Sequence, residues 1–146
     1  MCYVKIENPH NNLSMQPKST AQELEILTIR KYFRKEKADR YAEFVLSPRT
    51  RSKFVGCLAH LRDLDFRKFR KLIKNEAYQI REMAGNAKFD TCYVISENKH
   101  IDGQFLNIEN AIQDTIGSGM GTLLVFGLAE VVYYEGEDAN DRWISI

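Results

Sequence analysis

The feature that most constrains this chain is a run of strand-favouring side chains from Thr122 to Tyr134, Thr-Leu-Leu-Val-Phe-Gly-Leu-Ala-Glu-Val-Val-Tyr-Tyr. Alternate residues of a strand point to opposite faces, and here both alternating sets are apolar. That pattern is typical of a strand covered on both sides. Gly127 predicts a bulge or turn that divides the run into two strands. We therefore expect this segment to form the centre of the core, with helices from earlier in the chain over it.

The first half of the chain shows helical spacing. Thr20 followed by Glu23 is typical of a capping box, in which each side chain satisfies a backbone amide at the start of a helix. Apolar residues then recur at helical intervals. This first helix either continues to Leu46 or breaks near Lys35–Lys37, and the spacing alone leaves both alternatives open.

Two further helices are predicted before the strands begin. Ser47 is a good N-cap, and the proline after it suits the first helical position, so a second helix should continue to about Leu61. Asp63 or Asp65 then caps a third helix. Apolar residues keep to one side of it as far as Ala84, and a Gly-Asn pair ends it.

After Lys88 the composition favours strands. Thr91 to Ser96 predicts one strand and Arg142 to Ile146 predicts the last, while Asn107 caps a short helix between them. Together these elements predict an α+β protein, in which three N-terminal helices pack on a small, mainly antiparallel C-terminal sheet with one inserted helix.

The length of 146 residues fits a single domain over residues 1–146. Its start is less regular, and residues 1–18 are expected to form a loose arm unless Cys2–Ile6 adds an edge strand. A hydrophobic fraction of 44% with 28% charged residues is typical of a folded, soluble protein. No apolar run is long enough to span a membrane, and the N-terminus lacks a secretory pattern. We therefore expect a cytoplasmic location.

No cofactor or metal is expected from the motifs. Cys2, Cys57 and Cys92 lie far apart, without metal-ligand spacing, and predict buried free thiols. The glycine-rich segment 117–122 follows a predicted helix and precedes a strand, whereas phosphate-binding loops run from strand to helix. A structural turn is therefore the favoured interpretation of these glycines.

Charge is distributed unevenly along a chain whose net charge is only +1. Residues 30–74 contain 15 Lys and Arg against five Asp and Glu, whereas residues 75–146 contain four against 12. Three interpretations of this asymmetry stay open: solvated surface charge, an acidic partner for the basic half, or a homodimer in which the basic half of one subunit meets the acidic half of another.

The basic residues gather in three groups. A helical wheel places Arg67, Arg70, Lys71, Lys74 and Arg81 on one side of the predicted third helix, beside its apolar face. Arg34 belongs to a second group, and a third opens the second helix with Arg49, Arg51 and Lys53. We hypothesise a small binding or regulatory protein that docks an acidic protein or nucleic acid, with contacts from Arg67, Arg70, Lys71, Lys74 and Arg34.

The alternative is a small hydrolytic enzyme with a carboxylate and histidine site near the C-terminal sheet. Its candidate residues are Glu130 with His100 or Asp102. No nucleophile motif supports it, so the sequence favours a binding protein over an enzyme.

Overall fold

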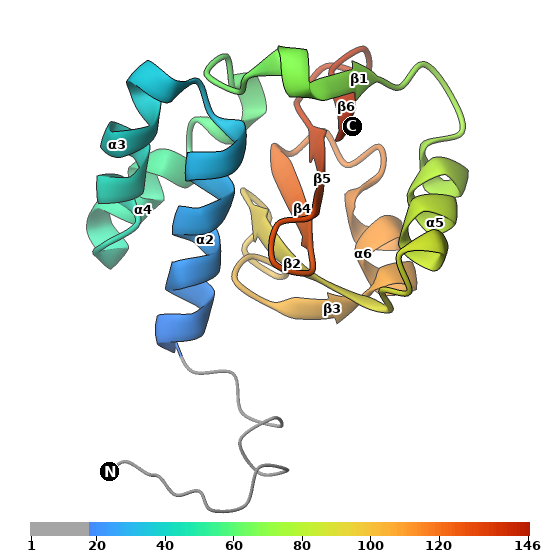
Figure 1. Ribbon diagram of the computed structural model, residues 1–146, viewed down its shortest axis with the longest axis horizontal. Helices are drawn as coiled ribbons and strands as arrows, with labels where there is room; N and C mark the ends of the chain where they lie inside the picture. Colours follow the sequence, from blue (N-terminus) through green and yellow to red (C-terminus); the bar gives the residue numbers. More distant parts are fainter. Residues whose placement is uncertain (1–17) are drawn as a thin grey trace, which may run out of the picture.

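The computed structural model describes residues 18–146 and shows a six-stranded antiparallel sheet between two layers of helices (Figure 1). The strand order is β1-β6-β5-β4-β2-β3. The strands are β1 (Phe69–Lys71), β2 (Thr91–Ser96), β3 (Phe105–Asn107), β4 (Thr122–Phe126), β5 (Val131–Glu135) and β6 (Arg142–Ser145). The helices are α2 (Lys18–Tyr32), α3 (Lys35–Phe44), α4 (Pro48–Val55), α5 (Glu76–Asn86) and α6 (Ile108–Thr115). The predicted α+β class is confirmed. The predicted strand Cys2–Ile6 and nearly all of the predicted arm lie outside the described residues.

The centre of the sheet is the predicted apolar run. Every residue of β4 is buried, and Gly127, with a φ of +61°, begins the turn that leads into β5. Leu123 and Tyr134 pack with α2, α3 and α4 on one face of the sheet, whereas Leu124 and Tyr133 pack with α5 and α6 on the other. The expectation that both faces are covered is therefore confirmed.

The long first helix breaks, as one of the two alternatives predicted. α2 ends at Tyr32 because the next residues form a short backbone bridge to a distant segment, with Phe33 opposite Leu64. The amide of Arg34 donates to the carbonyl of Asp63 at 2.8 Å, and the amide of Asp65 donates to the carbonyl of Tyr32 at 2.8 Å. These bonds compete with continuation of the helix, and α3 starts at Lys35.

The predicted third helix is largely wrong. The chain forms a single 3-10 turn, η2 (Phe66–Lys68), then strand β1, and α-helix begins only at Glu76. Phe69 and Leu72 lie three residues apart, a spacing that would place them on the same face of a helix. In extended chain an odd separation places two side chains on opposite faces, and here Phe69 and Leu72 pack in the core clusters on opposite faces of the sheet. Pairing of β1 with β6 outweighed the local helical spacing.

Two predicted helix caps, Ser47 and Asn107, are confirmed. The Ser47 side chain accepts from the amide of Thr50 at the start of α4, and the Asn107 side chain accepts from the amide of Asn110 at the start of α6. α4 ends at Val55, before the predicted Leu61. Thr20 lies inside α2 rather than at its cap.

None of the helices within residues 18–146 is both long and apolar enough to cross a bilayer. Of the cysteines in this part of the chain, Cys92 is buried, as expected for a free thiol, whereas Cys57 is exposed.

Candidate functional site

The predicted contact residues do not form one basic helical face. Arg70 and Lys71 lie on strand β1, whose alternation sends them to opposite faces of the sheet. Arg70 donates to Gln79 of α5 at 2.9 Å, whereas the ammonium of Lys71 lies 5.5 Å from the ring centre of Trp143 on the other face. Lys74 is exposed in the connection to α5. The helical wheel failed because there is no helix at these residues.

Arg34 and Arg67, by contrast, lie together in one groove of about 630 Å³. The groove runs between the α2–α3 junction and the segment around η2, which the Phe33–Leu64 bridge holds side by side. We call it the basic groove. Its lining contains six cationic side chains and two carboxylates and consists of Arg30, Phe33, Arg34, Lys35, Glu36, Arg62, Leu64, Asp65, Phe66, Arg67 and Lys68.

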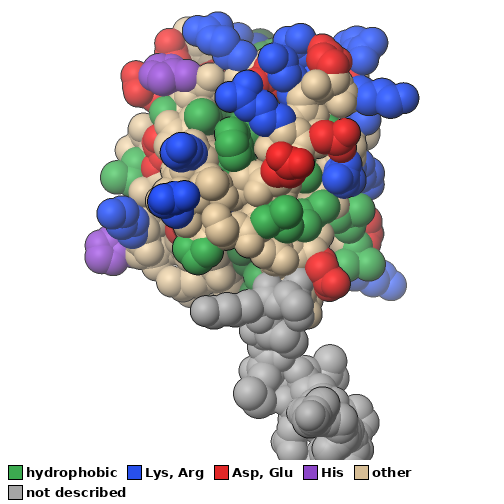
Figure 2. Space-filling model, turned by 90° about the vertical axis from the view of Figure 1, so that its left-hand side faces the viewer, with side chains coloured by type: hydrophobic (Ala, Val, Ile, Leu, Met, Phe, Trp, Pro, Cys, Tyr) green, Lys and Arg blue, Asp and Glu red, His purple; other side chains and the backbone are tan. Residues whose placement is uncertain are grey.

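Some of these cations are neutralised locally. Arg34 is ion-paired with Glu36 at 2.7 Å, and Arg67 with Asp65 at 2.8 Å. The hydrogen bonds from these two guanidinium groups lower the pKa of both carboxyl groups. Lys35 and Arg62 are exposed and make no ion pair or side-chain hydrogen bond with any other residue in the range 18–146. Figure 2 shows Lys and Arg side chains gathered toward the top of the α2–α4 face, with acidic side chains among them.

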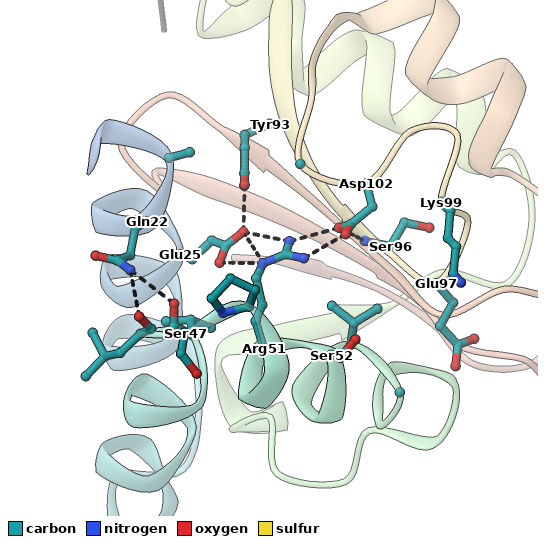
Figure 3. Close-up of a pocket in the computed structure, with 17 residues that line it drawn as sticks. Gln22, Glu25, Ser47, Arg51, Ser52, Tyr93, Ser96, Glu97, Lys99 and Asp102 are labelled. Carbon is teal, nitrogen blue, oxygen red and sulfur yellow. Dashed lines mark hydrogen bonds and ion pairs between the residues drawn. The ribbon is translucent and has the colours of Figure 1, made fainter. Parts of the chain in front are cut away.

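A second cavity, which the sequence did not predict, has a volume of about 650 Å³ (Figure 3). We call it the Arg51 pocket. It lies between the N-terminal half of α2, the α3–α4 connection, α4 and the β2–β3 loop. Its lining consists of Ala21, Gln22, Glu25, Val45, Leu46, Ser47, Pro48, Arg51, Ser52, Val55, Gly56, Tyr93, Ser96, Glu97, Lys99, Asp102 and Gly103.

An ion-pair network forms one wall of this pocket. Figure 3 shows Arg51 between two carboxylates, 2.7 Å from Glu25 and 2.7 Å from Asp102. The Tyr93 hydroxyl donates to the Glu25 carboxylate at 2.6 Å, and the backbone amide of Ser96 donates to Asp102 at 3.0 Å. The Glu25 side chain is only 2% exposed, whereas those of Arg51 and Asp102 are 22% and 20% exposed.

The electrostatics of the network keep Arg51 charged. Its hydrogen bonds to Asp102 and Glu25 raise the pKa of Arg51 in spite of partial burial, and burial together with Glu25 raises the pKa of Tyr93. One guanidinium faces two carboxylates, so the network carries excess negative charge.

Arg51 was expected among surface cations, and the structure corrects that expectation. The signal that we missed is Glu25, which precedes Ile29 by four residues and so shares its buried side of α2.

A related network lies beneath the opposite face of the sheet. Arg142 is ion-paired with Glu76 at 2.7 Å and lies 3.7 Å from Glu135, whose side chain is 1% exposed. Glu135 also accepts from the Tyr133 hydroxyl at 2.7 Å and from the amide of Gly117 at 2.8 Å. Burial raises the pKa of Glu135 despite these bonds. Neither the basic groove nor the Arg51 pocket includes a residue of this cluster.

The residues of the hydrolytic alternative are not brought together. Ser96 pairs with Thr122 at the start of β4, and the loop that follows Ser96 carries His100 and Asp102. Glu130 lies in the turn after the opposite end of β4. No group of three or more His, Cys, Asp and Glu within residues 18–146 has the arrangement of a metal site.

Comparison of the chain with protein-family models, curated protein sequences and solved structures gave no match.

Proposed function

We propose that this is a small binding protein that docks an acidic partner, protein or nucleic acid, in the basic groove. The observation that carries the proposal is the presence of Lys35 and Arg62 on the two paired segments of one groove, both exposed and without an anionic partner among residues 18–146. Cations placed on a fixed surface bind successive anionic groups and release their counterions. The contact set therefore changes from the predicted five residues to Arg34, Arg67, Lys35 and Arg62.

The backbone supports the proposal because hydrogen bonds hold the two sides of the groove together. The bridge between Phe33 and Leu64 buries both side chains and leaves Arg34 and Arg62 exposed beside them. A preformed arrangement of charges loses little conformational entropy when a partner binds. The expected cytoplasmic location remains a prediction.

Paired charge reversals test the proposal. Lys35→Glu with Arg62→Glu should weaken binding of a fluorescein-labelled mixed-sequence oligonucleotide or of a polyglutamate peptide by about tenfold or more, measured by fluorescence anisotropy at low salt. The preferred probe identifies the class of partner. The matched control is Arg70→Glu with Lys74→Glu, which makes the same change of charge outside the groove and should have a much smaller effect.

Two results contradict the proposal. Wild-type protein that binds neither probe at low salt has no anion-binding groove. Equal losses in the two double variants indicate that net charge, rather than the groove, attracts the probe. Light scattering at low and high salt tests the homodimer alternative in the same samples, because a dimer held by opposite charges dissociates as salt screens them.

A further inference from the structure

We infer that the Arg51 pocket binds a small organic amine, a molecule with a cationic ammonium group and an apolar body. The inference does not rest on the proposed function, because the pocket and the basic groove share no lining residue. They lie toward opposite ends of α2, with Gln22 and Glu25 in the pocket and Arg30 and Phe33 in the groove.

The first step is size and shape. A volume of about 650 Å³ lies within the range of roughly 300 to 1,000 Å³ that is usual for pockets that bind small molecules. The network of Glu25, Arg51 and Asp102 spans α2, α4 and the β2–β3 loop and holds these three elements in place around the cavity. The wall is therefore preformed, and binding requires little ordering of the chain.

The second step is charge. The lining contains three carboxylates, Glu25, Glu97 and Asp102, against the two cations Arg51 and Lys99. Arg51 has little capacity left for an anionic ligand, because four of the five N–H groups of its guanidinium already donate to Glu25 and Asp102. An anion in this pocket meets excess negative charge, whereas an ammonium group is attracted by it.

The third step is the distribution of polar and apolar groups. Asp102 is partly exposed beside Arg51, and the Ser52 hydroxyl makes no hydrogen bond within residues 18–146, so both oxygens can accept from an ammonium. The lining also contains apolar side chains, of which Leu46 is 57% exposed. An apolar body placed against Leu46, Val45 and Pro48 removes that surface from water.

Three probes that differ only in one group test the inference: benzylamine, benzyl alcohol and benzoate. In a titration followed by amide chemical shifts, benzylamine should give saturable shifts at Gln22, Ser52, Ser96 and Gly103. Benzyl alcohol should bind more weakly, and benzoate should not shift these amides. The inference is overturned if benzylamine leaves these signals unchanged or if benzoate binds as well as benzylamine does.

Two variants change the charge of the pocket in opposite directions. Asp102→Asn should lower the affinity for benzylamine about two- to fivefold, and Lys99→Met should raise that affinity by a similar factor. The second variant keeps the test decisive if the first disturbs the fold, because Lys99 makes no ion pair or hydrogen bond among residues 18–146. Lys74→Met, the same exchange outside the pocket, should leave the affinity unchanged. Equal affinities in Lys99→Met and the wild type would refute the charge argument.

Discussion

Replacement of Arg51 by Met is the most direct test of the ion-pair network. The exchange keeps a long side chain but removes the cation that Glu25 and Asp102 share, and it leaves Tyr93 as the remaining side-chain donor to Glu25. Since the Glu25 side chain is only 2% exposed, its carboxylate cannot recover these bonds from water. Loss of one partner of a buried ion pair costs about 3 to 5 kcal/mol. That is a large part of the roughly 5 to 15 kcal/mol by which a domain is stable.

Urea unfolding followed by tryptophan fluorescence measures this loss. Trp143 is the only tryptophan in the sequence, and its ring centre lies 4.6 Å from that of Phe66, so unfolding changes its surroundings. Arg81→Met is the matched control because it breaks an ion pair with Glu109 on the exposed surface and should change stability little. If the slope of the unfolding free energy against urea concentration is the same in all variants, the variants differ in stability alone.

A double variant separates the buried charge from the loss of packing. Glu25→Gln with Arg51→Met removes the charge that the single variant leaves without its partner, so it should be more stable than Arg51→Met alone. The reasoning is refuted if Arg51→Met costs no more than Arg81→Met, or if the double variant is no more stable than Arg51→Met.

Two further predictions concern the sheet. Gly121→Ala should lower the melting temperature, because a Cβ there would lie 2.3 Å from the backbone of η1 (Leu58–His60), whereas Gly85→Ala in α5 meets nothing within 4 Å and should be neutral or stabilising. Burial raises the pKa of Glu135 above its ordinary value of 4.5, so its contribution to stability is greatest at low pH and is lost as the pH rises through the raised value. The free energy of unfolding of Glu135→Gln, measured with urea, should therefore increase relative to that of the wild type as the pH rises from about 4 to about 8. Burial alone would raise the pKa of Glu76, but hydrogen bonds from Arg142 and the backbone lower it below 4.5. The stability that Glu76 contributes is therefore present above pH 4.5 and is lost as the pH falls through the lowered value, so Glu76→Gln should lose least stability relative to the wild type at the lowest pH.

The parts of the fold that the sequence predicted depend on neighbouring residues. Ser47 and Asn107 cap helices through amides three residues away, and Gly127 turns the chain where its own backbone requires a positive φ. The two-sided apolar pattern of β4 also predicted that helices cover both faces. Each of these signals is complete within a few residues, so sequence spacing alone is sufficient to find it.

The parts that the sequence missed depend on distant residues. β1 exists because β6 lies beside it, and the spacing of Phe69 and Leu72 suits a helix equally well until that partner is known. Arg51 is 26 residues from Glu25 and 51 from Asp102, so its place in a basic run gave no sign of its burial. The basic groove likewise requires the bridge from Phe33 to Leu64. Only Arg34 and Arg67 of the predicted set lie in the groove.

The position of β6 between β5 and β1 has a consequence for synthesis of the protein on the ribosome. Among residues 18–146, β1 is an edge strand that pairs with β6 alone, with Phe69 opposite Ser145. While the chain is being translated, the segment that becomes β1 has no strand to join, although its local spacing favours a helix. The pairing of β1 with β6 can form only after Ser145 has left the exit tunnel, so this edge of the sheet depends on contacts between residues far apart in the chain.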